Sequence, residues 1–150
     1  MTLHVDTAVR LIVLASTTIV ATACTMRSLP PVARVELRDS WARIADSGAI
    51  SGAYMFIANN DTVPIVLVGV TSVDAAAEVH ETMQHDGMAH MMPRTELRVP
   101  AGELFKMEPG GVHVMLIALK RRLAVGDSVR LRMHFSDSTD MNVVVPVRAP

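Results

Sequence analysis

The sequence predicts an all-β domain, built as a sandwich or barrel of short strands. From Val32 onward, no stretch shows the period of an amphipathic helix. Short runs rich in Val, Ile, Leu and Met recur instead, and Gly, Pro, Asn and Asp separate them. Strands that repeat at intervals of about 8 to 12 residues are typical of sandwiches and barrels. Because only 3% of the residues are aromatic, we expect an aliphatic core, with Met107, Met133 and Met141 as fillers.

Each predicted strand is an apolar run that ends at a turn signal. The turns are Asn59–Asp61, Pro109–Gly111 and Val125–Asp127. The segment Met83–His90 has no such run and is predicted to be a polar surface loop, which Met91 closes. In chain order, the predicted strands are Val35–Ile44, Gly52–Asn59, Ile65–Thr71, Ala76–Met83, Thr95–Val99, Leu104–Met107, Val112–Leu119, Ser128–Phe135 and Asn142–Arg148.

The N-terminal segment has the pattern of a bacterial lipoprotein signal. Leu11–Ala23 is an apolar run preceded by Arg10, and it is shorter than the roughly 20 residues of a membrane span. Its end, Ala21-Thr22-Ala23, followed by Cys24, resembles a lipobox. We therefore expect a signal peptide over residues 1–23, a proline-containing tether over residues 24–33, and the folded β-domain over residues 34–150.

Three fates of this segment stay open, and all of them put the domain outside the cytoplasm, in the periplasm or at the cell surface. In the first, Cys24 is acylated and anchors a lipoprotein to the membrane. In the second, a general signal peptidase cuts after Ala23 and releases a freely secreted protein. In the third, the apolar run remains uncleaved as an anchor.

Charge and cysteine content exclude several classes of function. The net charge is -1 and aromatic residues are few, so no nucleic-acid partner is expected. The one cysteine, Cys24, precedes the domain, so the domain has no internal disulfide and no Cys-x-x-Cys redox pair. A blue-copper electron carrier is excluded as well, because its metal needs a cysteine thiolate beside two histidines.

The segment from His80 to Met115 concentrates metal-binding side chains. It holds four of the 6 histidines and six of the 11 methionines. Thioethers hold Cu(I) well and bind Mg, Ca or Zn poorly, while imidazole suits copper in either oxidation state. This set of donors therefore indicates copper, as Cu(I). It also suits an oxidising compartment, where free thiols are easily lost to disulfides.

Four of these residues form the pattern H-x10-M-x21-H-x-M: His80, Met91, His113 and Met115. Residues two apart on a strand point to the same face, so His113 and Met115 would present a nitrogen and a sulfur side by side. The pattern resembles the copper-binding signature of the periplasmic PCu(A)C copper chaperones. The resemblance extends over Val35–Val147 through the segments Asp39-Ser40-Trp41-Ala42-Arg43, Gly52-Ala53-Tyr54-Met55, Val79-His80-Glu81-Thr82, Pro100-Ala101-Gly102, Pro109–Leu116 and Leu119-Lys120.

The resemblance implies a cupredoxin-like Greek-key β-barrel that binds Cu(I) with His80, Met91, His113 and Met115. It implies a chaperone rather than an enzyme, with the dinuclear copper centre of cytochrome c oxidase subunit II, or another copper site, as acceptor. The alternative is a copper-buffering or resistance lipoprotein that has the same site and no dedicated acceptor. The sequence does not separate the two. Met92 is the reserve ligand next to Met91.

Between His80 and Met91 lies a second set of donors, which consists of Met83, His85, Met88 and His90. In the plainer interpretation these residues belong to a polar surface loop. In the other they form an entry path or a weak second site, which takes Cu(II) through His85 and His90. Glu81 is a candidate to orient His80, as carboxylates often orient metal-binding histidines, although adjacent strand residues face opposite ways.

Overall fold

The computed structural model describes residues 33–149 apart from Asp86, and the fold of these residues is all-β, as predicted. The strands form a 10-stranded sheet in the order β5-β4-β8-β2-β1-β10-β9-β3-β6, and β7 pairs with β2. Their bounds are β1 Val35–Arg43, β2 Ser51–Asn59, β3 Ile65–Ser72, β4 Ala76–His85, β5 Met88–Pro93, β6 Leu97–Val99, β7 Leu104–Met107, β8 Val112–Ile117, β9 Ser128–Phe135 and β10 Asp140–Arg148.

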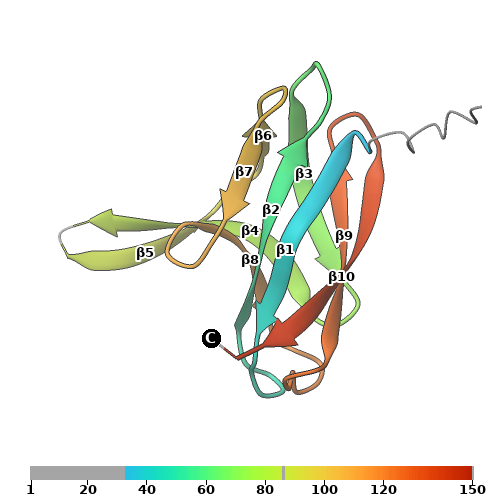
Figure 1. Ribbon diagram of the computed structural model, residues 1–150. Coiled ribbons are helices and arrows are strands. Elements are labelled where there is room, and N and C mark those ends of the chain that lie inside the picture. The colour runs from blue at the N-terminus through green and yellow to red at the C-terminus, as the bar shows by residue number, and fades with distance from the viewer. Residues whose placement is uncertain (1–32, 86, 150) are drawn as a thin grey trace, which may run out of the picture. The chain divides into compact units, whose positions relative to one another are not determined.

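The sheet folds on itself into two layers that enclose the core (Figure 1). One layer contains β5, β4, β8, β2, β7 and β1, and the other contains β10, β9, β3 and β6. β1 joins the layers, because it pairs with β2 in antiparallel fashion and with β10 in parallel fashion. The other strand pairs are antiparallel. This arrangement agrees with the predicted barrel or sandwich.

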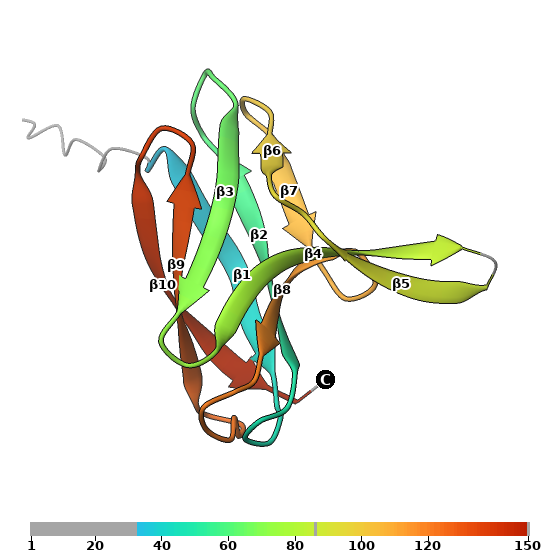
Figure 2. The same ribbon diagram turned by 180° about the vertical axis from the view of Figure 1, so that it is seen from behind.

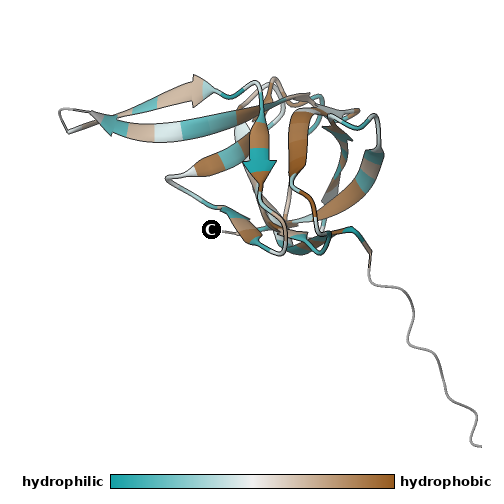
Figure 3. Ribbon diagram, turned by 90° about the horizontal axis from the view of Figure 1, so that it is seen from above, coloured by the Kyte–Doolittle hydropathy of each residue, from teal (hydrophilic) through white to brown (hydrophobic). Residues whose placement is uncertain are grey.

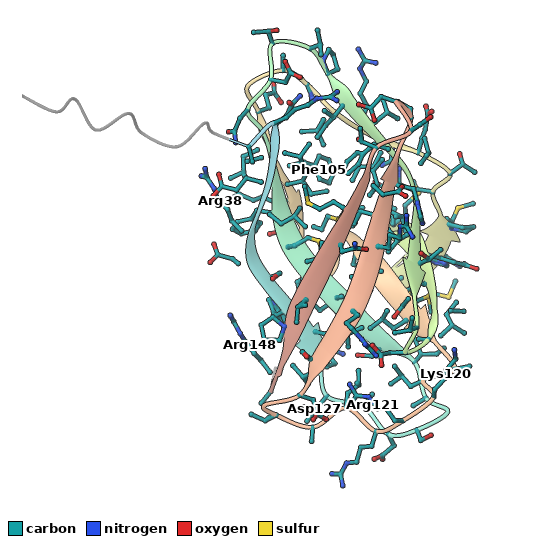
Figure 4. The ribbon with its side chains drawn as sticks, turned by 90° about the vertical axis from the view of Figure 1, so that its right-hand side faces the viewer. Arg38, Phe105, Lys120, Arg121, Asp127 and Arg148 are labelled. Carbon is teal, nitrogen blue, oxygen red and sulfur yellow. The ribbon has the colours of Figure 1, made fainter. Side chains whose placement is uncertain are left out.

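The core is built from aliphatic residues and methionine. Met107 and Met133 are fully buried, as predicted, while Met141 is partly buried against the core. Phe105 also packs against the core, and Figure 4 shows its ring between the two layers. Along β9, buried residues alternate with more exposed ones, which is the pattern expected of a strand with one face toward the core.

The predicted surface loop over Met83–His90 is instead a β-hairpin. β4 continues to His85, and β5 pairs with it in antiparallel register. Every residue of β5 is exposed, so this strand buries no apolar face. The alternation that identifies a half-buried strand is therefore missing from its sequence, and the prediction was wrong. Figures 1 and 2 show the hairpin extending beyond the other strands.

Residues 1–32 lie outside the part of the chain that the structure describes. The signal peptide, the acylation of Cys24 and nearly all of the tether therefore stay predictions. At the start of the described part, Arg34 forms ion pairs with Asp61 and Asp137. In the described residues, we find no helix with the length and apolar character that a membrane crossing requires.

Candidate metal centre

Two histidines lie opposite each other on neighbouring strands. The antiparallel register of β4 and β8 sets His80 directly across from His113. Directly opposed residues of an antiparallel pair share one face of the sheet. The centroids of the two imidazole rings are 6.4 Å apart, and only 8% of His80 and 6% of His113 are exposed. The fold thus brings two buried imidazoles together from distant parts of the sequence.

One nitrogen of each imidazole is bound to a hydrogen-bond acceptor. Nε2–H of His80 donates to Oε2 of Glu78 at 2.9 Å, and Nδ1–H of His113 donates to the carbonyl oxygen of Gly111 at 3.1 Å. Because a carboxylate and a carbonyl only accept, these bonds place the proton of a neutral imidazole on the bonded nitrogen, and the neutral rings then have a lone pair on Nδ1 of His80 and on Nε2 of His113.

Nδ1 of His80 stands out among the buried polar atoms. Of the buried side-chain nitrogens and oxygens in the described residues, it alone has no hydrogen-bond partner. Buried polar atoms in folded proteins nearly always have a partner, so an exception calls for an explanation. A metal ion bound at this nitrogen is such an explanation. Metal-binding histidines also typically donate their other N–H to a carboxylate or a backbone carbonyl, which both rings do here.

The two predicted methionine ligands lie on the same face of the sheet as the histidines. Met115 follows His113 by two residues, and Met91 lies across from Thr82, which follows His80 by two residues. Met91, His113 and Met115 line one small pocket of about 120 Å³. Met91 is 56% exposed, so its side of the pocket is open to solvent. One face of β4, β5 and β8 therefore carries all four predicted ligands.

Two aromatic residues continue this face beyond the histidines. The ring centroid of Tyr54 lies 6.0 Å from that of His113 and 4.5 Å from that of Trp41. Tyr54 also lines the pocket, and its hydroxyl lies over Gly52, where an added Cβ would come within 2.5 Å of it. Gly52 lies across from Met115. A glycine at this position therefore leaves room for the tyrosine beside the methionine.

Glu78 is a residue of the centre that the sequence interpretation missed. Glu81, the candidate to orient His80, pairs with Arg94 at 3.0 Å instead. Glu78 precedes His80 by two residues and shares its face of β4, which was the available signal. Met92, the reserve ligand, lies across from Glu81 and so faces away from the centre.

The second set of donors does not join this centre. Met83 lies directly across from His90, and each is an odd number of residues from the nearest predicted ligand on its strand, His80 or Met91. Because the strand period is two, both side chains belong to the opposite face of the hairpin. The side chain of His85 lies outside the described residues.

In the described residues, neither a cluster of His, Cys, Asp or Glu side chains nor a larger pocket indicates another metal centre at the predicted ligands. Within residues 33–149 without Asp86, no three His, Cys, Asp or Glu side chains are grouped in a way that would hold a metal ion. A larger pocket of about 440 Å³, lined by residues of β3, β9 and β10 and the adjoining Val73, contains none of the predicted ligands. The side chains that line the pocket with His113 include the thioethers of Met91 and Met115.

Solved structures share this fold. The copper-bound PCuAC domain from PmoF2 matches with a TM-score of 0.65 at 23% identity, over 81% of this chain and 97% of that domain. The solution structure of CuI-DR1885 from Deinococcus radiodurans matches with a TM-score of 0.58 at 30% identity, over 83% of each chain. These likenesses confirm the cupredoxin-like architecture.

Sequence comparison identifies the family. The model of the family described as "Putative lipoprotein LpqE-like" matches residues 35–147. A relative from Leifsonia xyli subsp. xyli (strain CTCB07), named "Putative lipoprotein Lxx21020", is 33% identical over 116 residues, which cover 76% of this chain and 69% of the relative. The family model spans nearly all of the β-domain, and we conclude that this chain belongs to the LpqE-like lipoprotein family.

Proposed function

We propose that this protein is an extracytoplasmic copper chaperone that binds one Cu(I) with His80, Met91, His113 and Met115. The observation that carries the proposal is the pair of opposed histidines. Each ring has one nitrogen held by an acceptor and the other left with its lone pair, and Nδ1 of His80 is buried without a partner. The likeness to CuI-DR1885 supports copper as the metal.

The donor set suits a metal that is carried and then released. Two imidazole nitrogens and two thioether sulfurs are neutral, and thioethers favour Cu(I) over harder ions. Both imidazoles must be unprotonated to bind. The affinity is therefore expected to fall as the pH drops through the range in which histidines take up a proton.

Different residues of the site would hold copper and release it. Glu78 and the Gly111 carbonyl orient the two imidazole rings through hydrogen bonds, while Tyr54 lines the pocket beside His113. Met91 is the exposed donor, so it would be the first to exchange with a ligand of the acceptor. Copper would then pass from one protein to the other one donor at a time. By resemblance, the acceptor is the dinuclear copper centre of cytochrome c oxidase subunit II.

A Cu(I) titration tests the site. The chain is titrated without oxygen against a chromogenic chelator, in a Cys24→Ser background that removes the one thiol. One tight equivalent is expected, and the double variant His113→Ala/Met115→Leu should lose it. If the wild-type chain cannot compete with the chelator, or if the double variant competes equally well, the proposed site is wrong.

A transfer experiment separates a chaperone from a copper buffer. The copper-loaded chain is mixed with the metal-free soluble domain of cytochrome c oxidase subunit II, with excess chelator present to trap any released copper. A chaperone fills the acceptor in spite of the chelator, because copper passes within a protein complex. Complete loss of copper to the chelator would favour the buffering or resistance lipoprotein.

We also propose that the protein is a lipoprotein, anchored to the membrane through an acyl group on Cys24. The match to a lipoprotein family and the lipobox-like junction support this. Replacing Cys24 by alanine is expected to move the protein from the membrane fraction to the soluble fraction, because the acyl group loses its attachment point. Cell fractionation measures the change, and copper binding of the released protein should be intact. Retention in the membrane fraction would contradict acylation as the anchor.

Replacing Glu78 by glutamine is expected to lower Cu(I) affinity about tenfold, within the usual range for partners that orient a metal-binding histidine. The amide can still accept one hydrogen bond, but it removes the charge that strengthens the bond to Nε2–H of His80. Chelator competition measures the loss. Glu81→Gln is the matched control, because Glu81 pairs with Arg94 and not with the ring. Equal effects of the two variants would show that only the net charge matters.

A further inference from the structure

The β4–β5 hairpin has two faces, and each carries soft metal donors. His80 and Met91 belong to the face of the metal centre. The opposite face, called the outer face below, carries Met83 on β4 and, on β5, three residues at intervals of two: Met88, His90 and Met92. The register therefore sorts the histidines and methionines of this segment into two separate groups.

The outer-face residues are close neighbours. Met83 lies directly across from His90. Directly opposed residues in an antiparallel pair have Cβ atoms about 4.5 to 5.5 Å apart, and the diagonal neighbours are roughly 7 to 8 Å away. Met88 and Met92 flank His90 along β5 at positions i−2 and i+2, so flexible thioether chains surround one imidazole on three sides.

These methionines are unusually exposed for apolar residues. Met83 is 52% exposed, Met88 60% and Met92 56%. Figure 3 shows the hairpin extending away from the other strands, which agrees with the exposure of these side chains. The only carboxylate of the described residues on the face, Glu81, is paired with Arg94. Among the side chains that the structure describes on this face, this leaves one imidazole and three thioethers, which is a set suited to a soft monovalent cation.

We propose that the outer face of the hairpin is a second binding site for Cu(I), formed by Met83, Met88, His90 and Met92. It has one nitrogen donor and lies in solvent, so it binds Cu(I) more weakly than the centre on β4 and β8. Met91 and Met92 are adjacent in sequence and belong to opposite faces, so the two groups of donors meet on β5. The second site would gather copper close to the exposed edge of the main pocket.

The proposal does not depend on the main centre, and the test treats the two sites separately. Cu(I) is titrated without oxygen into the full chain in the Cys24→Ser background. A parallel titration with Ag(I), which is a soft monovalent ion without redox chemistry, follows the methyl NMR signals of methionine. We expect two equivalents, the second at least tenfold weaker than the first. The second should shift the methyl signals of Met83, Met88 and Met92 but not those of buried Met55 and Met133.

Three variants assign the equivalents. Met83→Leu/His90→Gln keeps the size of the side chains and removes two donors, so it should abolish only the weaker equivalent. His113→Ala/Met115→Leu should abolish only the tighter one. Gln84→Leu is the control. It places a leucine on β4 next to Met83 but on the other face of the hairpin, so neither copper equivalent should change. A second equivalent that survives Met83→Leu/His90→Gln, or its absence from the wild-type chain, would overturn the proposal and leave the exposed methionines as a contact surface for another protein.

Discussion

Replacing His113 by alanine is expected to lower Cu(I) affinity about 100-fold, which corresponds to roughly 2.8 kcal/mol. The variant loses one of two imidazole donors and leaves His80 opposite an empty space on β8. It also removes the ring whose Nδ1–H is fixed by the Gly111 carbonyl. A site that keeps only one orienting bond and one nitrogen should hold Cu(I) no better than an exposed cluster of methionines.

The measurement is anaerobic competition with a Cu(I) chelator, together with thermal unfolding to show that the variant still folds. His134→Ala is the matched control. It removes an imidazole from β9, where His134 binds Thr71 at 3.0 Å and Asp140 at 2.7 Å. The hydrogen bond between His134 and Asp140 is the main reason why the pKa of Asp140 is lowered. Equal affinity in wild type and His113→Ala would remove His113 from the site.

The sequence could propose a set of ligands for the centre but not how the fold assembles them. His113 and Met115 follow from strand geometry, because residues two apart share a face. Nothing local in the sequence shows that β4 lies beside β8 with His80 across from His113. That pairing is a long-range property of the sheet. The spacing to His80 and Met91 therefore had meaning only through the resemblance to a family.

The β4–β5 hairpin, which the sequence predicted to be a loop, shows where the alternation of apolar and polar residues no longer identifies a strand. The strands that face the core have apolar residues on one side, and their positions were close to those observed. β5 is exposed on both faces, so hydrophobic burial leaves no mark on its sequence. Its register nevertheless decides the chemistry, because it separates Met91 from Met92 and thereby the metal centre from the outer face.

Replacing Leu116 by alanine is expected to lower the free energy of unfolding by about 3 kcal/mol, within the usual range for buried leucine. Leu116 follows Met115 on β8 but points to the other side of the sheet, where it is fully buried in the core. Its loss leaves a cavity that the close-packed neighbours can fill only in part. Chemical denaturation measures the change, and Val144→Ala at a position that is 64% exposed is the control, with an expected change below about 0.5 kcal/mol.

The two faces of β8 give the sharpest test of the structure. His113→Ala should change copper affinity strongly and stability less, whereas Leu116→Ala should do the reverse in the molecules that remain folded. The reason is the strand period of two, which separates the donors from the core residues along one short segment. If Leu116→Ala weakened copper binding as much as His113→Ala does, the donors would not be held by their own strand and hydrogen bonds. Core packing would then set the geometry of the site, and the register of β4 and β8 alone would not account for it.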